Sequence, residues 1–98
     1  MNEKESKNIT AQQLSYILNT IKSPTTILII LELQKNTKTL KQLLKLIDNN
    51  SEQKLRSSIR KLQRHRIIYH TTKNKIKSYH ILNNQLASWL YQAIDLIK

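Results

Sequence analysis

The apolar residues of this 98-residue chain change their period, and this change limits the folds that the chain can adopt. Within residues 14–62 they recur at i, i+3, i+4 and i+7, the spacing of helices that bury one face. Within residues 67–81 two apolar stretches flank a polar tip at residues 72–75, which is typical of a β-hairpin. Helical spacing returns over residues 86–97. The sequence therefore predicts a mostly α fold with one small hairpin before the last helix.

Capping residues mark where the first three helices begin. Thr10 is a suitable N-cap for the first helix, and Thr39 for the third. The second helix should begin at Ser23 and Pro24, because the serine oxygen can accept from first-turn amides and proline fits the first turn. Its apolar run, residues 27–31, is also compatible with a buried strand, but the Ser-Pro start favours a helix.

A three-residue turn, Asp48 to Asn50, separates the third helix from the fourth. Asp and Asn tolerate the left-handed backbone that a tight turn needs, in a chain with no glycine. Asn50 or Ser51 should cap the fourth helix, and Asn83 or Asn84 the last. Two helices joined by so short a turn, followed by a hairpin, give the order of a winged helix-turn-helix, α-α-α-α-β-β-α.

The length allows one domain. We expect a disordered tail at residues 1–8 and a folded domain at residues 9–98, in which residues 83–98 form a dimerisation helix. The sequence has no cysteine, which favours an intracellular protein, cytoplasmic or in the host cytoplasm if a virus or plasmid encodes it. Its apolar runs are too short for a membrane span, so we expect no membrane partner.

Positive charge is concentrated in the second half of the chain. The formal charge is +11, and residues 53–94 contain nine basic residues and no acidic one. Because like charges repel, a long segment of one sign is tolerated best beside a polyanion. Double-stranded DNA is therefore the predicted partner.

The exposed arc of the fourth helix, residues 51–65, consists of side chains that can hydrogen-bond. Base edges are usually read from the N-terminal part of such a helix, and phosphates are bound further along. The predicted base-reading residues are Gln53, Lys54, Arg56 and Ser57. The predicted phosphate contacts are Arg60, Lys61 and Arg64. The predicted wing contacts, on the flanking groove, are Lys73, Asn74, Lys75 and Lys77.

Three segments resemble the ArsR/SmtB family of winged-helix repressors. SPTTILIILEL is similar to the family's DPTRLRILxLL, SEQKLRSSIRKLQRHRII to its SQSTVSRHLKxLxxAGLV recognition helix, and YHILN to its YYxL. The resemblance spans about residues 14–98. It implies a repressor that binds a palindromic operator as a homodimer. The first and last helices would form most of the dimer interface. The resemblance also implies a recognition segment of Gln53, Lys54, Ser57 and Ser58, although the helical wheel places Ser58 nearer the core.

The chain departs from this family at three places. Its TLKQLLKLI helix lacks the Cys ligands of the family's metal sensors and has no His or acid either, so we expect no metal and no cofactor. Arg66 and Asn74 stand where the family has glycines before and within the wing. MarR-like repressors and small winged-helix regulators of viruses or plasmids are similar enough to stay open as alternatives.

The last helix has a wide apolar stripe, which can cover the chain's own core or form a dimer face. We favour the homodimer, because so small a domain gains from burying Trp89 against a second copy. The predicted interface residues are Leu14, Ile17, Leu86, Trp89, Leu90, Ala93, Ile94 and Ile97.

Other chemistry has little support in the sequence. His70 and His80 could approach each other across the hairpin, but without thiols or carboxylates nearby they do not indicate a metal site. The six acidic residues are scattered, and no spacing suggests a catalytic triad of Ser, His and Asp. We therefore expect that the protein is not an enzyme. The alternative functions are a non-specific nucleic-acid-binding or architectural protein and a winged-helix protein-interaction module.

Overall fold

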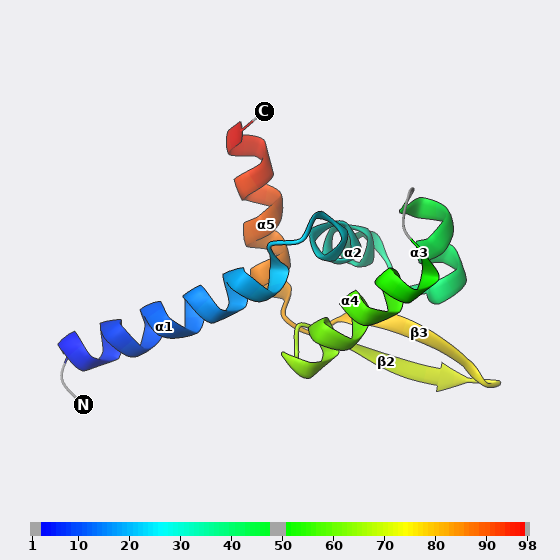
Figure 1. The fold of residues 1–98 in the computed structure, drawn as a ribbon, viewed down its shortest axis with the longest axis horizontal. Coiled ribbons are helices and arrows are strands. Elements are labelled where there is room, and N and C mark those ends of the chain that lie inside the picture. Colours follow the sequence, from blue (N-terminus) through cyan, green and yellow to red (C-terminus); the bar gives the residue numbers. More distant parts are fainter. Residues whose placement is uncertain (1–2, 48–50, 98) are drawn as a thin grey trace.

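The computed structural model describes the backbone of residues 3–47 and 51–97, and Figure 1 shows its arrangement. The elements in chain order are α1 (Glu3–Ile21), α2 (Pro24–Lys35), β1 (Lys38–Thr39), α3 (Leu40–Leu46), α4 (Glu52–Arg64), β2 (Ile68–Lys73), β3 (Ile76–Ile81) and α5 (Asn84–Ile97). This order confirms the predicted mostly α fold with a hairpin wing before the last helix. It adds one short strand, β1, to the prediction.

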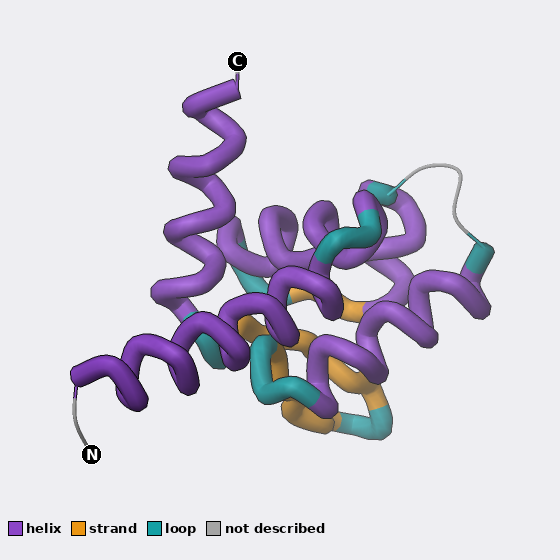
Figure 2. The backbone as a smooth tube through the Cα atoms, turned by 60° about the vertical axis from the view of Figure 1, so that its left-hand side comes forward, coloured by secondary structure: helices purple, strands orange, loops and turns teal. Residues whose placement is uncertain are grey.

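The core is built around α2, which contacts α1, α4, α5 and β3. Its central residues Ile29 and Ile30 are fully buried, as are Leu43 of α3 and Leu55 and Leu62 of α4. The apolar run of residues 27–31 is therefore a buried helix and not a strand. The free ends of α1 and α5 extend away from this core in different directions (Figures 1 and 2).

The first helix is longer than the sequence indicated. It begins at Glu3, so residues 3–8, which the sequence analysis assigned to a tail, are helical in the structure, and Thr10 lies inside the helix and not at its N-cap. Residues 1 and 2 lie outside the described part of the chain. The physical reason is that no glycine or proline occurs before Pro24, so no residue ends a helix that is extended towards the N-terminus.

The predicted turn at Asp48 to Asn50 lies outside the described residues, but both of its flanks are described. On one side, the amide of Ile47 donates to the carbonyl of Leu43 at 2.9 Å as α3 ends. On the other, Ser51 Oγ accepts from the amide of Lys54 at 3.1 Å. Ser51 is therefore the N-cap of α4, one of the two predicted alternatives.

The other predicted caps have different outcomes. Thr39 and Gln42 form a capping box at the start of α3, and Asn83 Oδ1 accepts from the amide of Leu86 at 3.0 Å at the start of α5. Ser23 occupies the N-cap and Pro24 the first turn of α2 as predicted, but the Ser23 side chain does not make the predicted capping hydrogen bond.

Strand β1 makes the sheet three-stranded, in the order β1-β3-β2, with antiparallel pairing throughout. Lys38 pairs with Tyr79 and Thr39 with Ser78. Lys38 is buried, and its Nζ donates to the carbonyl of Glu32 at 3.1 Å at the end of α2. The positive ammonium lies at the negative, C-terminal end of the α2 dipole, which is a favourable interaction. Because Lys38 also pairs with Tyr79 of β3, this residue links α2 to the base of the wing.

Two sharp bends of the wing use residues with positive φ in place of glycine. Arg66, at φ 57°, ends α4 in a Schellman motif: its amide donates to the carbonyl of Gln63 at 3.0 Å, and the amide of Ile67 to that of Leu62 at 2.9 Å. At the tip, Asn74 and Lys75 have φ of 53° and 67°. Positive φ at both central residues is the signature of a type I′ turn.

No individual helix within residues 3–47 and 51–97 has both the length and the apolar content of a membrane span. Residues Ala11–Ile21 and Pro24–Lys35 reach those limits only as a pair, which is bent by 96°.

The strained lysine at the wing tip predicts a stabilising substitution. Lys75→Gly should raise the free energy of unfolding by about 1 kcal/mol, because a left-handed backbone costs a residue with a Cβ about that much. The measurement is urea unfolding followed by circular dichroism. Lys77→Gly is the matched control inside β3, and it should lower the free energy of unfolding. Equal destabilisation by both changes would contradict this description of the turn.

Candidate nucleic-acid interface

The exposed face of α4 carries the residues that the sequence singled out. Leu55, Ile59 and Leu62 are buried as predicted, and Ser58 is only 8% exposed, as the helical wheel indicated. All the predicted base-reading and phosphate-contacting residues are exposed: Gln53, Lys54, Arg56, Ser57, Arg60, Lys61 and Arg64. The helix therefore separates an apolar inner face from an outer face of hydrogen-bonding side chains.

Part of this outer face meets the wing. Residues of α3, α4 and the wing line a hollow of about 650 Å³, which we call the wing hollow: Thr39, Leu40, Lys41, Leu44, Glu52, Arg56, Lys75, Ile76, Lys77 and Tyr79. It brings Arg56 of α4 together with Lys75 and Lys77 of the wing, positions that are about 20 residues apart in the sequence. A polyanion entering here would meet basic side chains from three elements.

One acidic side chain lies within this basic region. Arg56 Nε is 3.6 Å from Glu52 Oε2, and the two side chains are 53% and 57% exposed. An ion pair so exposed contributes at most about 1 kcal/mol. Arg56 can therefore exchange this carboxylate for a phosphate or a base edge at little cost.

The opposite side of α4 faces the start of α2. Here a second hollow of about 390 Å³, which we call the α2 hollow, is lined by Ser23, Thr26, Ser51, Gln53, Lys54, Ser57, Ser58 and Lys61. Sequence reasoning found the α4 members but missed Ser23 and Thr26. Nothing local marks these two residues, because only the packing of α2 against α4 brings them to the site.

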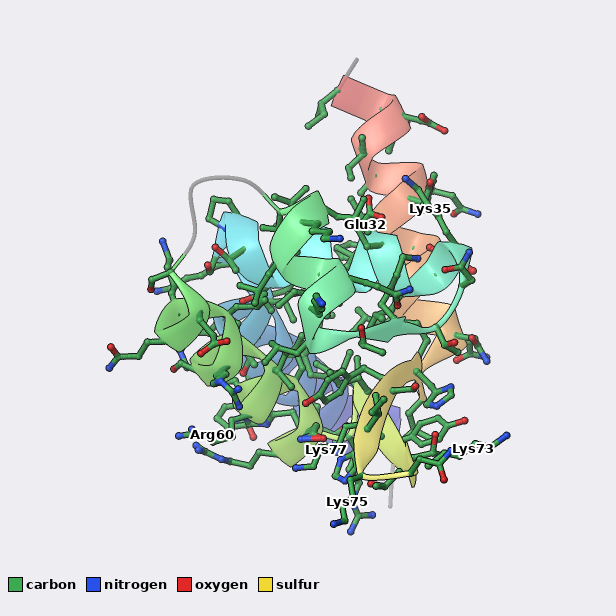
Figure 3. The ribbon with its side chains drawn as sticks, turned by 90° about the vertical axis from the view of Figure 1, so that its right-hand side faces the viewer. Glu32, Lys35, Arg60, Lys73, Lys75 and Lys77 are labelled. Atoms are coloured by element: carbon green, nitrogen blue, oxygen red, sulfur yellow. The ribbon has the colours of Figure 1, made fainter. Side chains whose placement is uncertain are left out.

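The remaining basic residues extend the same surface. Arg60 and the three wing lysines lie along one side of the molecule in Figure 3, and the pair of Glu32 and Lys35 lies on the opposite side. All four predicted wing residues are exposed: Lys73, Asn74, Lys75 and Lys77. Arg60 and Arg64 line neither hollow, so they lie at the margin of the site and not in its recesses.

Two of the histidines, His70 and His80, make contacts with residues of the hairpin and of α4. His70 pairs with Tyr79 and Tyr69 with His80, so alternation along the strands places His70 and His80 on opposite faces of the hairpin. The suggestion that they approach each other is therefore wrong. His70 Nδ1 lies 2.6 Å from Gln63 Oε1 of α4, and His80 stacks on Tyr69 with ring centroids 4.8 Å apart.

The described residues contain no group of three or more His, Cys, Asp or Glu side chains that could hold a metal ion. The absence of a cofactor and of catalysis remains a prediction from the sequence.

The predicted dimer residues fall into three groups. Leu86 and Leu90 are 9% and 7% exposed, so the chain's own core already buries them. Ile17, Ala93 and Ile94 are half-buried. The exposed members are Leu14, Trp89 and Ile97, at 47%, 45% and 84%. Two further apolar side chains on the same helices are exposed: Leu18 on α1 is 38% exposed and Leu96 on α5 is 86% exposed. Neither was among the predicted interface residues.

Comparisons with known proteins give matches in structure only. No family model and no curated protein sequence matches the chain. The crystal structure of the transcriptional repressor BigR from Xylella fastidiosa superposes with a TM-score of 0.84 at 17% identity, covering 97% of this chain and 96% of that one.

Two further crystal structures have similar coverage of this chain. The transcriptional regulator HlyU from Vibrio vulnificus CMCP6 superposes with a TM-score of 0.79 at 14% identity, over 98% of both chains. The adhesin competence repressor AdcR from Streptococcus pyogenes superposes with a TM-score of 0.70 at 19% identity, over 97% of this chain and 74% of that one. At such low identity these similarities establish the fold, and the fold is that of the winged-helix regulators.

Proposed function

We propose that this chain is a transcriptional regulator that binds a specific double-stranded DNA sequence. The observation that carries the proposal is the outer face of α4, on which every predicted contact residue is exposed and which shares the wing hollow with Lys75 and Lys77. A helix that offers hydrogen-bonding side chains beside a basic hairpin suits a major groove and the backbone next to it. The structural similarity to winged-helix regulators supports this function.

Each part of the surface has a distinct proposed role. The first half of α4 reads base edges through Gln53, Lys54, Arg56 and Ser57. The second half contacts phosphates through Arg60, Lys61 and Arg64. The wing follows the flanking groove with Lys73, Asn74, Lys75 and Lys77, an arrangement that the type I′ turn favours because it places the tip residues at the outer end of the hairpin.

We further propose that the protein is an ArsR/SmtB-like repressor that acts as a homodimer on a pseudo-palindromic site. Two of the similar structures are those of repressors, BigR and AdcR. The dimer is supported by the exposed apolar side chains on the projecting helices, Leu14 and Leu18 on α1 and Trp89, Leu96 and Ile97 on α5. A two-fold dimer would present two α4 helices to half-sites about one DNA turn apart.

Removing two arginines of α4 tests the DNA-binding surface. Arg56→Ala combined with Arg60→Ala should weaken binding to a random-sequence duplex about tenfold or more, because each guanidinium makes charged hydrogen bonds. The slope of log K against log salt should become shallower by about 0.9, because Arg60 is the one proposed phosphate contact that this variant loses. Fluorescence anisotropy at several salt concentrations measures both quantities. The fold should survive, since both side chains lie outside the core.

A charge-matched control separates this surface from the general positive charge. Lys35→Ala combined with Lys45→Ala also removes two exposed cations, from a part of the molecule next to the end of α2. This variant should keep both its affinity and its salt slope. If the two double variants lost the same affinity, the binding would depend on total charge, and the proposed role of α4 would be wrong.

Charged substitutions on α5 test the proposed dimer. Trp89→Glu and Ile97→Glu should each convert a two-chain particle into a single chain of 11.6 kDa in sedimentation at micromolar concentration, because a buried unpaired carboxylate opposes association. Leu46→Glu on α3 is the control, since Leu46 is 50% exposed and lies away from α1 and α5. A wild-type protein that sediments as one chain would refute the dimer.

A further inference from the structure

The α2 hollow has the chemistry of an oxyanion site. Its lining includes five hydroxyl side chains and two ammonium groups, from the starts of α2 and α4 and from their facing sides: Ser23, Thr26, Ser51, Ser57, Ser58, Lys54 and Lys61. None of the lining residues carries a carboxylate. Hydroxyl and ammonium donors around one recess, with no competing negative charge, favour an anionic oxygen such as that of a phosphate.

Two of these hydroxyls belong to residues that are more than nine-tenths buried. Thr26 is 1% exposed and Ser58 is 8% exposed, and no hydrogen bond joins either side chain to another residue in the described part of the chain. Their remaining accessible surface opens into the hollow that they line. Because both hydroxyls line the hollow and have no partner within the described residues, each can donate to a ligand oxygen there.

The start of α2 adds a partial positive charge. Pro24 lies at the first turn and Ser23 makes no capping hydrogen bond, in contrast to Ser51, which caps α4. The side chain of Ser23 therefore remains available to the hollow beside the positive end of a 12-residue helix. Helix N-termini that meet basic and hydroxyl side chains bind phosphate groups.

We propose that the α2 hollow holds one phosphate of the DNA backbone, so that α2 is a third DNA-contacting element beside α4 and the wing. This inference rests on the proposed DNA-binding function. Gln53, Lys54 and Ser57, which line the hollow, are also predicted to read bases. A phosphate held next to them fixes the depth and register of α4 in the groove, which is the role that backbone contacts have in sequence-specific recognition.

The test removes the two unpaired hydroxyls without changing the charge. Thr26→Val combined with Ser58→Ala should lower the affinity for a duplex about tenfold, because hydrogen bonds to a charged phosphate are lost. The salt slope should stay unchanged, since no cation is removed. The thermal midpoint should stay about equal, because neither hydroxyl makes a hydrogen bond to another described residue that the change would remove. Thr37→Val, an exposed hydroxyl beyond the other end of α2, is the control and should change none of these quantities.

A second measurement uses the wild-type chain and so does not depend on how a variant folds. Adding a short duplex should shift the backbone amide resonances of Thr26 and Ser58 and leave that of Thr37 in place. Inorganic phosphate, added at constant ionic strength, should shift the same two resonances, and duplex should displace it.

The outcomes separate this inference from the proposed function. Full duplex affinity in the double variant, with unshifted Thr26 and Ser58 resonances in the wild type, would overturn the phosphate site and leave DNA binding intact. If the wild type bound no duplex at any salt concentration, the proposed function would fail. A response to inorganic phosphate in that case would identify a site for a free phosphate compound and overturn the assignment to DNA.

Discussion

The burial of α2 determines where every other element lies. Its Ile29 and Ile30 are fully buried, and the helix contacts α4 and α5 together with the central strand of the sheet. The same helix is held at its C-terminal end by the Lys38 ammonium, which belongs to the strand that pairs with β3. Helix α4 and the wing therefore take their relative positions from one shared apolar centre and not from direct contact with each other alone.

This arrangement leaves a surface that is unfavourable for an isolated protein. With the apolar side chains of α4 turned inward, the basic residues between positions 53 and 94 gather on the outer face and the hairpin, where few acids offset them. Self-repulsion in such a surface is relieved when a polyanion neutralises it. The hollows on either side of α4 give that polyanion recesses to enter, one against the wing and one against the start of α2.

Much of the fold follows from local signals in the sequence. Thr39 was predicted as a cap, and Ser51 and Asn83 each as one of two candidates, because capping depends on the residue and its next three neighbours; all three are caps in the structure. The buried residues of α4 follow from helical spacing in the same way. The extension of α1 back to Glu3 was missed because helix propensity without apolar periodicity gives little signal.

The features that sequence reasoning missed depend on contacts between distant segments. Strand β1 has two residues and exists because Lys38 pairs with Tyr79, so it has no periodicity of its own. The burial of Leu90 in the chain's own core could not be separated from burial in a dimer, because both give the same apolar stripe. The contribution of Thr26 to the α2 hollow requires the packing of α2 against α4, which no local pattern reports.

Selection of DNA by the purified protein from a random duplex pool, repeated at two salt concentrations, tests the central claim most directly. We expect an enriched pseudo-palindrome with half-sites about one helical turn apart. As salt rises, the affinity for this duplex should stay far above the affinity for a scrambled duplex. Binding that falls equally on both duplexes as salt rises, with no enriched motif, would contradict sequence-specific regulation and identify a non-specific nucleic-acid-binding protein.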